Sequence, residues 1–181
     1  PKSVSGSTKR VDDYRMPTGK RSHCHNEAYE KDFVFENEKG QFLGVAIRAY
    51  NNGVAFRYAI APDAEGECVT EDFTTYTVSE GANRWMQPYK VDYEDFYPLS
   101  DSSVPGSEWG YPALIEAGDS VFTLITEANI MRGACASRLV AGDTPGEYRV
   151  KLADDKMAVN GAAWYPWRII MIGSLADIVE S

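Results

Sequence analysis

The sequence has few of the residues on which catalytic and metal sites are commonly built. Its 181 residues include two histidines and three cysteines, and no two cysteines form a Cys-x-x-Cys motif. Neither a structural zinc site nor a dithiol redox site is therefore predicted. Cys24, Cys68 and Cys135 lie far apart, and we expect buried free thiols, with one disulfide as the alternative.

Other functional signatures are missing as well. The chain has no Gly-x-Ser-x-Gly elbow, no serine–histidine–aspartate order and no glycine-rich loop for a phosphate. The net charge of −9 argues against a nucleic-acid partner, because no basic surplus is present to displace counterions. No apolar run is long enough to predict a membrane span.

Aromatic residues and alternating patterns are abundant instead. Aromatics make up 12% of the chain, with 11 tyrosines and 4 tryptophans. Such side chains suit β-sheets and the flat faces of sugars, although ordinary core packing is the alternative for each of them. From Phe33 onward the hydrophobic pattern has a period of two, which predicts many short strands and a mainly β, antiparallel sandwich.

The clearest predicted hairpin covers residues 41–60. Asn52-Gly53 is typical of a type I′ turn between its arms. That register places Arg48 opposite Arg57, so we expect an acidic side chain to bridge the two guanidinium groups. A turn at Asn51-Asn52 is the alternative, and it removes this pairing.

The remaining pattern predicts one domain and a short flexible end. We expect residues 1–13 to be flexible and residues 14–181 to form the β-sandwich. An isoleucine-rich closing strand lies so near the C-terminus that the chain is expected to be a fragment of a larger protein, with an incomplete sandwich. The other predicted elements are a hairpin over 111–128, strands within 68–78 and at 147–152, a turn at 143–146 and a helical turn at 174–180.

The two histidines lie close together. His23, His25 and Glu27 are two residues apart, so a strand would point all three in the same direction. Two imidazoles and a carboxylate on one face could bind zinc. Ordinary polar lining near a sheet edge is the alternative.

Carboxylates are plentiful, and one has a distinctive place. The acidic loop at residues 92–95 is expected to be solvated, and the sequence does not bring Glu116 or Asp119 to a partner at the distance that glycoside hydrolysis needs. Glu127 ends an apolar strand, where a carboxylate at a sheet rim would suit calcium. A solvated glutamate at a strand end is the alternative.

Several segments, in order, resemble the N-terminal domain of glycoside hydrolase family 97. The resemblance begins near Met16-Pro17-Thr18-Gly19-Lys20 and His25-Asn26-Glu27 and extends to about residue 180. It continues through the hairpin residues Arg48 to Tyr58. Leu124-Ile125-Thr126-Glu127-Ala128 resembles the family's His-Glu-Ala-Ala-Leu strand end, and Tyr165-Pro166-Trp167-Arg168 its Thr-Pro-Trp-Arg strand.

The resemblance implies a galactose-mutarotase-like β-sandwich packed on a catalytic (β/α)8 barrel of the same polypeptide. The family comprises bacterial exo-α-glycosidases, α-glucosidases or α-galactosidases, so it implies an oligosaccharide substrate and a periplasmic or secreted location. The barrel supplies the catalytic acid and base, so no catalytic residue is expected here. The sandwich contributes one calcium-ligand glutamate, which falls on Glu127, and calcium is expected only together with the catalytic domain.

Three other functions are alternatives for this chain. A free-standing carbohydrate-binding module would use exposed Trp85, Trp109 or Trp164. A structural domain without any site would only stabilise the barrel. A mutarotase-like enzyme would need its acid and base from the two histidines.

Overall fold

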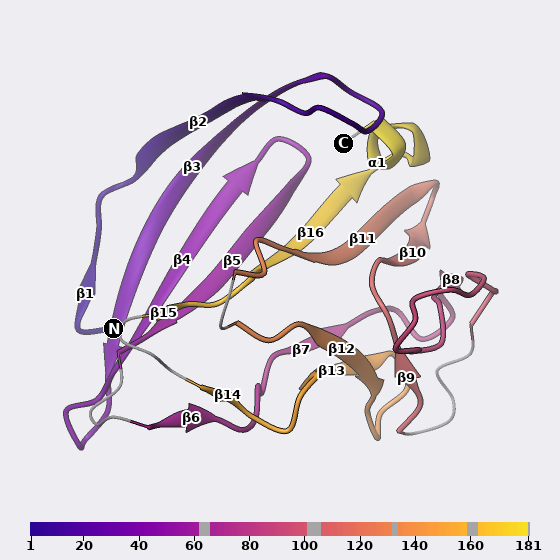
Figure 1. Cartoon of the computed structure of the whole chain (residues 1–181). Helices are drawn as coiled ribbons and strands as arrows, with labels where there is room; N and C mark the ends of the chain where they lie inside the picture. Colours follow the sequence, from indigo (N-terminus) through magenta and orange to yellow (C-terminus); the bar gives the residue numbers. More distant parts are fainter. Residues whose placement is uncertain (62–65, 101–105, 132–133, 159–162, 181) are drawn as a thin grey trace.

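The computed structural model describes residues 1–181 except 62–65, 101–105, 132–133, 159–162 and 181. Within the described residues the chain is mainly β, with strands paired antiparallel into sheets and one short helix at the C-terminal end. The largest sheet fans across the upper part of Figure 1, and the smaller sheets lie below it. The predicted mainly β, antiparallel architecture is confirmed.

The large sheet has ten strands in the order β1-β3-β4-β5-β16-β11-β10-β8, with β2 paired to β3 and β15 paired to β5. Its members are β1 (Ser3–Val4), β2 (Thr8–Arg15), β3 (His23–Glu36), β4 (Phe42–Tyr50), β5 (Gly53–Ile60), β8 (Arg84–Trp85), β10 (Ala113–Gly118), β11 (Val121–Ala128), β15 (Ala163–Trp164) and β16 (Trp167–Gly173). The isoleucine-rich β16 lies in the middle, between β5 and β11. It is the closing strand that the sequence predicts.

A four-stranded sheet in the order β7-β13-β12-β9 forms the second layer, and β14 pairs with β6 beside it. These strands are β6 (Cys68–Val69), β7 (Thr75–Thr77), β9 (Glu108–Trp109), β12 (Ser137–Ala141), β13 (Glu147–Leu152) and β14 (Met157–Ala158). The helix α1 (Leu175–Glu180) follows β16 and confirms the predicted helical turn. Ser174 and Asp177 cap it reciprocally, because the Ser174 amide donates to Asp177 Oδ2 at 2.8 Å and the Asp177 amide donates back to Ser174 Oγ at 3.2 Å.

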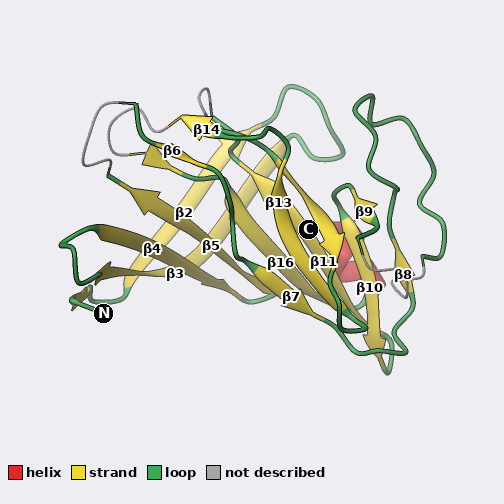
Figure 2. Cartoon of the chain, turned by 90° about the horizontal axis from the view of Figure 1, so that it is seen from below, coloured by secondary structure: helices red, strands yellow, loops and turns green. Residues whose placement is uncertain are grey.

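The main core lies between the large sheet and the four-stranded sheet, which face each other in Figure 2. Strand β13 shows how side chains reach the space between the sheets, because its buried residues Tyr148, Val150 and Leu152 alternate with exposed ones. Tyr148 and Val150 meet Ile115 and Ile125 of the large sheet, and Leu152 belongs to a second cluster with Cys135, Met157 and Tyr165. Two-residue alternation thus sets which side chains of β13 point between the layers.

The turn of the first hairpin differs from the main prediction. Tyr50 pairs with Gly53, so the turn is Asn51-Asn52, which was the alternative. None of these residues has a positive φ, and a type I′ turn requires it. Gly53 serves another purpose: a Cβ atom there would collide with the Ile170 carbonyl oxygen of β16. The glycine lets the two strands approach each other closely.

The N-terminal segment also differs from the prediction. Residues 1–13, which we expected to be flexible, contain β1 and most of β2, and both strands pair with β3. All eight residues of β2 are exposed, so the strand has no buried face that could produce an apolar alternation. Its backbone ladder with β3 holds it instead.

The described chain carries three free cysteines, of which only Cys135 is buried, so the prediction of buried thiols holds for that one alone. None of the described helical residues forms a segment long and apolar enough to cross a bilayer.

Candidate functional site

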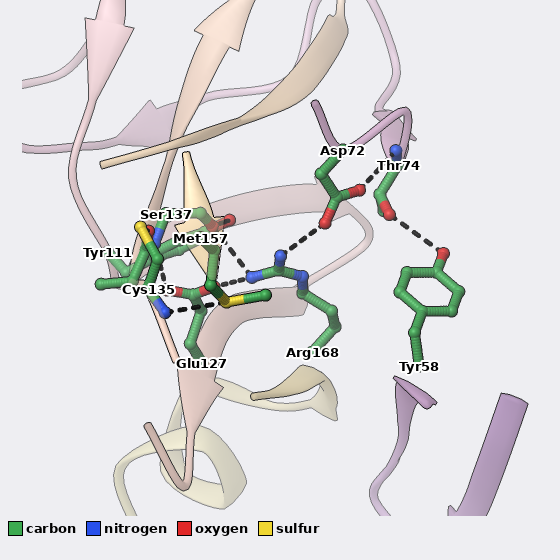
Figure 3. Close-up of polar contacts among 10 residues, drawn as sticks. Tyr58, Asp72, Thr74, Tyr111, Glu127, Cys135, Ser137, Met157 and Arg168 are labelled. Carbon is green, nitrogen blue, oxygen red and sulfur yellow. Dashed lines mark hydrogen bonds and ion pairs between the residues drawn. The ribbon is translucent and has the colours of Figure 1, made fainter. Parts of the chain in front are cut away.

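The candidate site is a buried polar network centred on Arg168 of β16. Glu127 of β11 is the direct cross-strand partner of Arg168. Ile125 and Ile170 belong to or pack against the main core, and each lies two residues from one member of the pair. Alternation therefore turns both Glu127 and Arg168 between the layers (Figure 3).

The Arg168 guanidinium has a partner on each side. Its Nη1 forms an ion pair with Glu127 Oε1 and donates to Ser137 Oγ at 2.9 Å. Its Nη2 donates to Asp72 Oδ2 at 2.7 Å. The side chains of Arg168, Glu127 and Asp72 are only 2%, 4% and 7% exposed. One buried cation is thus held by two buried carboxylates.

Ser137 and neighbouring hydroxyl groups complete the network. The Ser137 amide donates to Glu127 Oε2 at 2.9 Å, and Ser137 Oγ donates to Oε1 at 2.7 Å. Asp72 Oδ1 accepts the Thr74 amide at 2.8 Å, and Thr74 Oγ1 lies 3.0 Å from the Tyr58 hydroxyl. Because Ser137 belongs to β12 and Arg168 to β16, these bonds join the two layers.

Burial near the network also changes the acidity of two tyrosines. It raises the pKa of Tyr165 to about 12, and the negative charge of Asp72 adds to this effect. Burial likewise raises the pKa of Tyr111, whose hydroxyl lies 3.4 Å from Ser137 Oγ. Both phenols stay neutral at ordinary pH, so the network's charge comes from the arginine and its carboxylates.

Glu127 lies near the end of β11, as predicted, but it does not project from a sheet rim. Its carboxylate is turned inward and paired with Arg168, so the alternative of a solvated glutamate is wrong, and the role of Glu127 as a calcium ligand stays a prediction. Ile125, two residues earlier, points in the same direction and is buried, but the sequence did not indicate this direction, because Leu124 is equally apolar on the opposite face. Asp72 and Ser137 were missed because nothing local in the sequence connects them to Arg168.

The acceptor positions that remain free in the network limit how it could bind calcium. A carboxylate offers about four acceptor positions. Oε1 of Glu127 receives Arg168 and Ser137 Oγ, and Oε2 receives the Ser137 amide, which leaves one position on Oε2. Calcium takes about six to eight oxygens. The donor type fits calcium, but the described residues hold no group of three acidic, histidine or cysteine side chains that could bind a metal. Glu127 can supply one oxygen at most.

The histidine cluster is a half-exposed surface group. Asp13 of β2 accepts a contact from each imidazole, at 2.9 Å from His23 Nε2 and 3.0 Å from His25 Nδ1. Glu27 pairs with Lys9 at 2.9 Å and lies 3.6 Å from His25 Nε2. These contacts fit the alternative of polar lining near a sheet edge.

A second ionic cluster lies on the other face of the large sheet. Arg48 does not face Arg57 across the hairpin; Ala55 is its partner. Glu30 of β3 binds Arg48 Nε at 2.6 Å and Arg10 Nη2 at 2.7 Å, so the predicted acid is present but bridges Arg48 to Arg10. The expected bridge to Arg57 is absent among the described residues. Burial would raise the pKa of Glu30, but its hydrogen bonds from Arg48 and Arg10 outweigh that effect and lower it.

The tryptophans named for sugar binding differ in exposure. Trp109 packs against the main core, and the Trp85 ring lies 6.4 Å from that of Phe122. Trp164 is 45% exposed, and the Arg57 guanidinium lies 4.1 Å from its ring centre. The structure therefore offers one exposed tryptophan, not a platform of three.

Most other predicted acidic residues have ordinary surroundings. The loop at residues 92–95 is largely exposed, and Asp95 pairs with Lys90 at 2.6 Å. Glu116 accepts a hydrogen bond from Asn83 at 2.8 Å.

The model of the family described as "Glycosyl-hydrolase 97 N-terminal" matches residues 1–181. The chain belongs to this family. A probable retaining alpha-galactosidase of Streptomyces bingchenggensis is 29% identical in an alignment 181 residues long, and the alignment covers 98% of this chain. The chain spans 28% of the length of that relative.

Solved structures show the same fold. A glycoside hydrolase family 97 enzyme of Pseudoalteromonas sp. strain K8, in complex with acarbose, is similar with a TM-score of 0.80 and 23% identity. The match covers 98% of this chain and 29% of that one. A beta-arabinopyranosidase gives a TM-score of 0.78 and 25% identity over 94% of this chain and 32% of its own. Homologues of the glycosyl-hydrolase 97 N-terminal domain sit with a catalytic domain in the same chain.

Proposed function

We propose that this chain is the non-catalytic N-terminal β-sandwich of a calcium-dependent exo-α-glycosidase, an α-glucosidase or α-galactosidase, which packs on the catalytic barrel of the same polypeptide. The family match carries this proposal: it covers the whole chain, whereas the chain spans only 28% of its relative's length. The larger remainder is where the catalytic machinery would lie.

The engagement of the carboxylates supports a non-catalytic role. Glycoside hydrolysis needs an acid and a base placed on either side of the scissile bond. The most buried acids, Glu127, Asp72 and Glu30, are each held by arginine. We expect the purified 181-residue chain to leave aryl α-glycosides intact, while the full-length polypeptide hydrolyses them. Hydrolysis by the 181-residue chain alone, with an activity that follows the protein through purification, would contradict the proposal.

Glu127 is proposed to give one oxygen, Oε2, to a calcium ion whose other ligands come from the catalytic domain. When bound, calcium would orient the substrate and change the acidity of nearby carboxyl groups. Arg168 and Ser137 would fix the Glu127 carboxylate, so that its last acceptor position keeps one direction. Docking of the sandwich would thereby be linked to activity.

A matched pair of variants of the full-length polypeptide tests this role. Glu127→Gln removes a carboxylate oxygen and also weakens the network, whereas Ser137→Ala weakens the network but leaves the carboxylate. We expect the calcium concentration for half-maximal activity to rise about tenfold or more in the first variant and by less in the second, which loses one hydrogen bond to the carboxylate but keeps both of its oxygens. Equal calcium dependence in both variants would remove Glu127 from the calcium site.

The substrate and location are proposed from the family alone. We infer an oligosaccharide substrate and a periplasmic or secreted bacterial enzyme, which fractionation of the natural host would test.

The exposed Trp164 keeps a sugar-binding module as a second candidate. Oligosaccharide titration of the chain, followed by tryptophan fluorescence with Trp164→Phe as the control, distinguishes the two.

A further inference from the structure

Arg57 has an unusual position on the face of the large sheet that points away from the four-stranded sheet. It pairs with Ala46 across β4 and β5, and Trp164 and Trp167 lie on the same face. The Arg57 guanidinium carbon is 4.1 Å from the Trp164 ring centre and 4.3 Å from that of Trp167. Two indole rings therefore fix the direction of this cation.

Arg57 has no carboxylate partner among the described residues, although its neighbours do. Its Nε is buried without a hydrogen-bond partner. Arg48, which also stacks on Trp167 at 4.7 Å, is bound by Glu30 and Asp12. Both Glu30 oxygens are taken, one by Arg48 and the other by Arg10. Burial and the charge of Arg48 lower the pKa of Arg57, although the negative charges of Glu30 and Asp32 act in the opposite direction.

The surface around Arg57 is partly apolar and concave. Trp164 is 45% exposed beside the guanidinium. Next to it, Arg48, Trp167 and Ile169 are among the residues that line an open hollow of about 840 Å³. An aligned cation without an ion-pair partner, beside exposed aromatic surface, is suited to a partner that presents a carboxylate within an apolar patch.

We propose that this face, around Arg57 and Trp164, is the docking surface for the catalytic domain of the same polypeptide, which supplies a carboxylate to Arg57. The proposal rests on the proposed function. It commits to this occupant because the chain spans 28% of its relative and 29% of a matched enzyme, and because the Arg57 guanidinium forms no ion pair with a described residue. The planar guanidinium would bind that carboxylate through two hydrogen bonds.

The experiment compares unfolding temperatures in the 181-residue chain and in the full-length polypeptide by calorimetry. Arg57→Met keeps the stem that packs on the tryptophans and removes the charge. Arg149→Met is the control, because Arg149 is exposed on the other sheet and pairs with Glu147 and Asp143. In the full-length protein, Arg57→Met is expected to lower the sandwich transition by about 5 °C more than in the chain alone. Arg149→Met should shift both proteins equally.

The outcomes separate the two proposals. If the wild-type sandwich unfolds at the same temperature with and without the remaining polypeptide, the domains do not pack together and the proposed function fails. If they are coupled but Arg57→Met behaves like Arg149→Met, only the docking surface is wrong. If the chain alone forms dimers that Arg57→Met abolishes, a second copy is the occupant, and the proposal is overturned in favour of that copy.

Discussion

Adjacent residues of β16 point to opposite faces of the large sheet, and an arginine on each face is held by different partners. Arg168 points between the layers, where two carboxylates and a serine satisfy it. Trp167 points outward and carries Arg57, for which the described residues provide aromatic rings but no acid. A complete network holds a domain together by itself, whereas an incomplete one is suited to a partner.

The largest effect should come from breaking the inner network. Arg168→Met leaves Glu127 and Asp72 buried without their cation, and such a loss costs about 3–5 kcal/mol of unfolding free energy. Urea denaturation of the isolated chain measures it. Arg149→Met is the exposed control, with an expected change within about 0.5 kcal/mol. Similar losses in both variants would mean that the inner network does not stabilise the fold.

A smaller effect is expected when the outer cluster loses its acid. Glu30→Gln removes the charge that binds Arg10 and Arg48, and we expect a loss of about 1–3 kcal/mol in urea denaturation. The double variant Glu30→Gln with Arg48→Met should lose less than the sum of the single changes, because the two residues share one interaction. Additive losses would indicate that the pair is not coupled.

The smallest effect concerns pH in the exposed pairing of β2 with β3. Asp13 raises the pKa of His25, and His25 and His23 lower the pKa of Asp13. The His25 contribution is complete below its ordinary pKa of 6.5 and is lost as pH rises through the raised value. The Asp13 contribution is complete above 3.8 and is lost as pH falls through the lowered value.

Amide exchange in β2 should therefore be slowest between these two pH values, once intrinsic rates are corrected. The substitution Asp13→Asn should remove this dependence. A wild-type profile without a maximum in that range would show that these contacts do not hold the hairpin.

Local patterns predicted the strands that have one buried face. The hairpin of β10 and β11 was predicted closely, because Ile115 and Ile125 alternate with less buried residues on either side of a glycine-containing turn. Strand β2 was missed, since an exposed strand shows no apolar alternation. The Asn51-Asn52 turn was misassigned because Gly53 is required by contact with β16, which is more than a hundred residues away along the chain.

The candidate site was predictable only in part. The place of Glu127 near a strand end follows from the sequence, whereas its inward direction does not, because Leu124 and Ile125 put apolar side chains on both faces of β11. Its partners do not follow, because Asp72 lies 96 residues and Ser137 lies 31 residues from Arg168 along the chain. Only the packing of one sheet on the other brings these groups together.

The Glu127–Arg168 pair also fixes how β16 aligns along β11. A run such as Ile169-Ile170-Met171-Ile172 presents similar hydrocarbon at successive positions, so apolar contacts alone discriminate weakly between strands slid by two residues. A shift of that size would seat the guanidinium beside Ile125 or beyond the end of β11. The salt bridge therefore favours one register of β16 against β11, although the apolar residues of β16 are similar at successive positions.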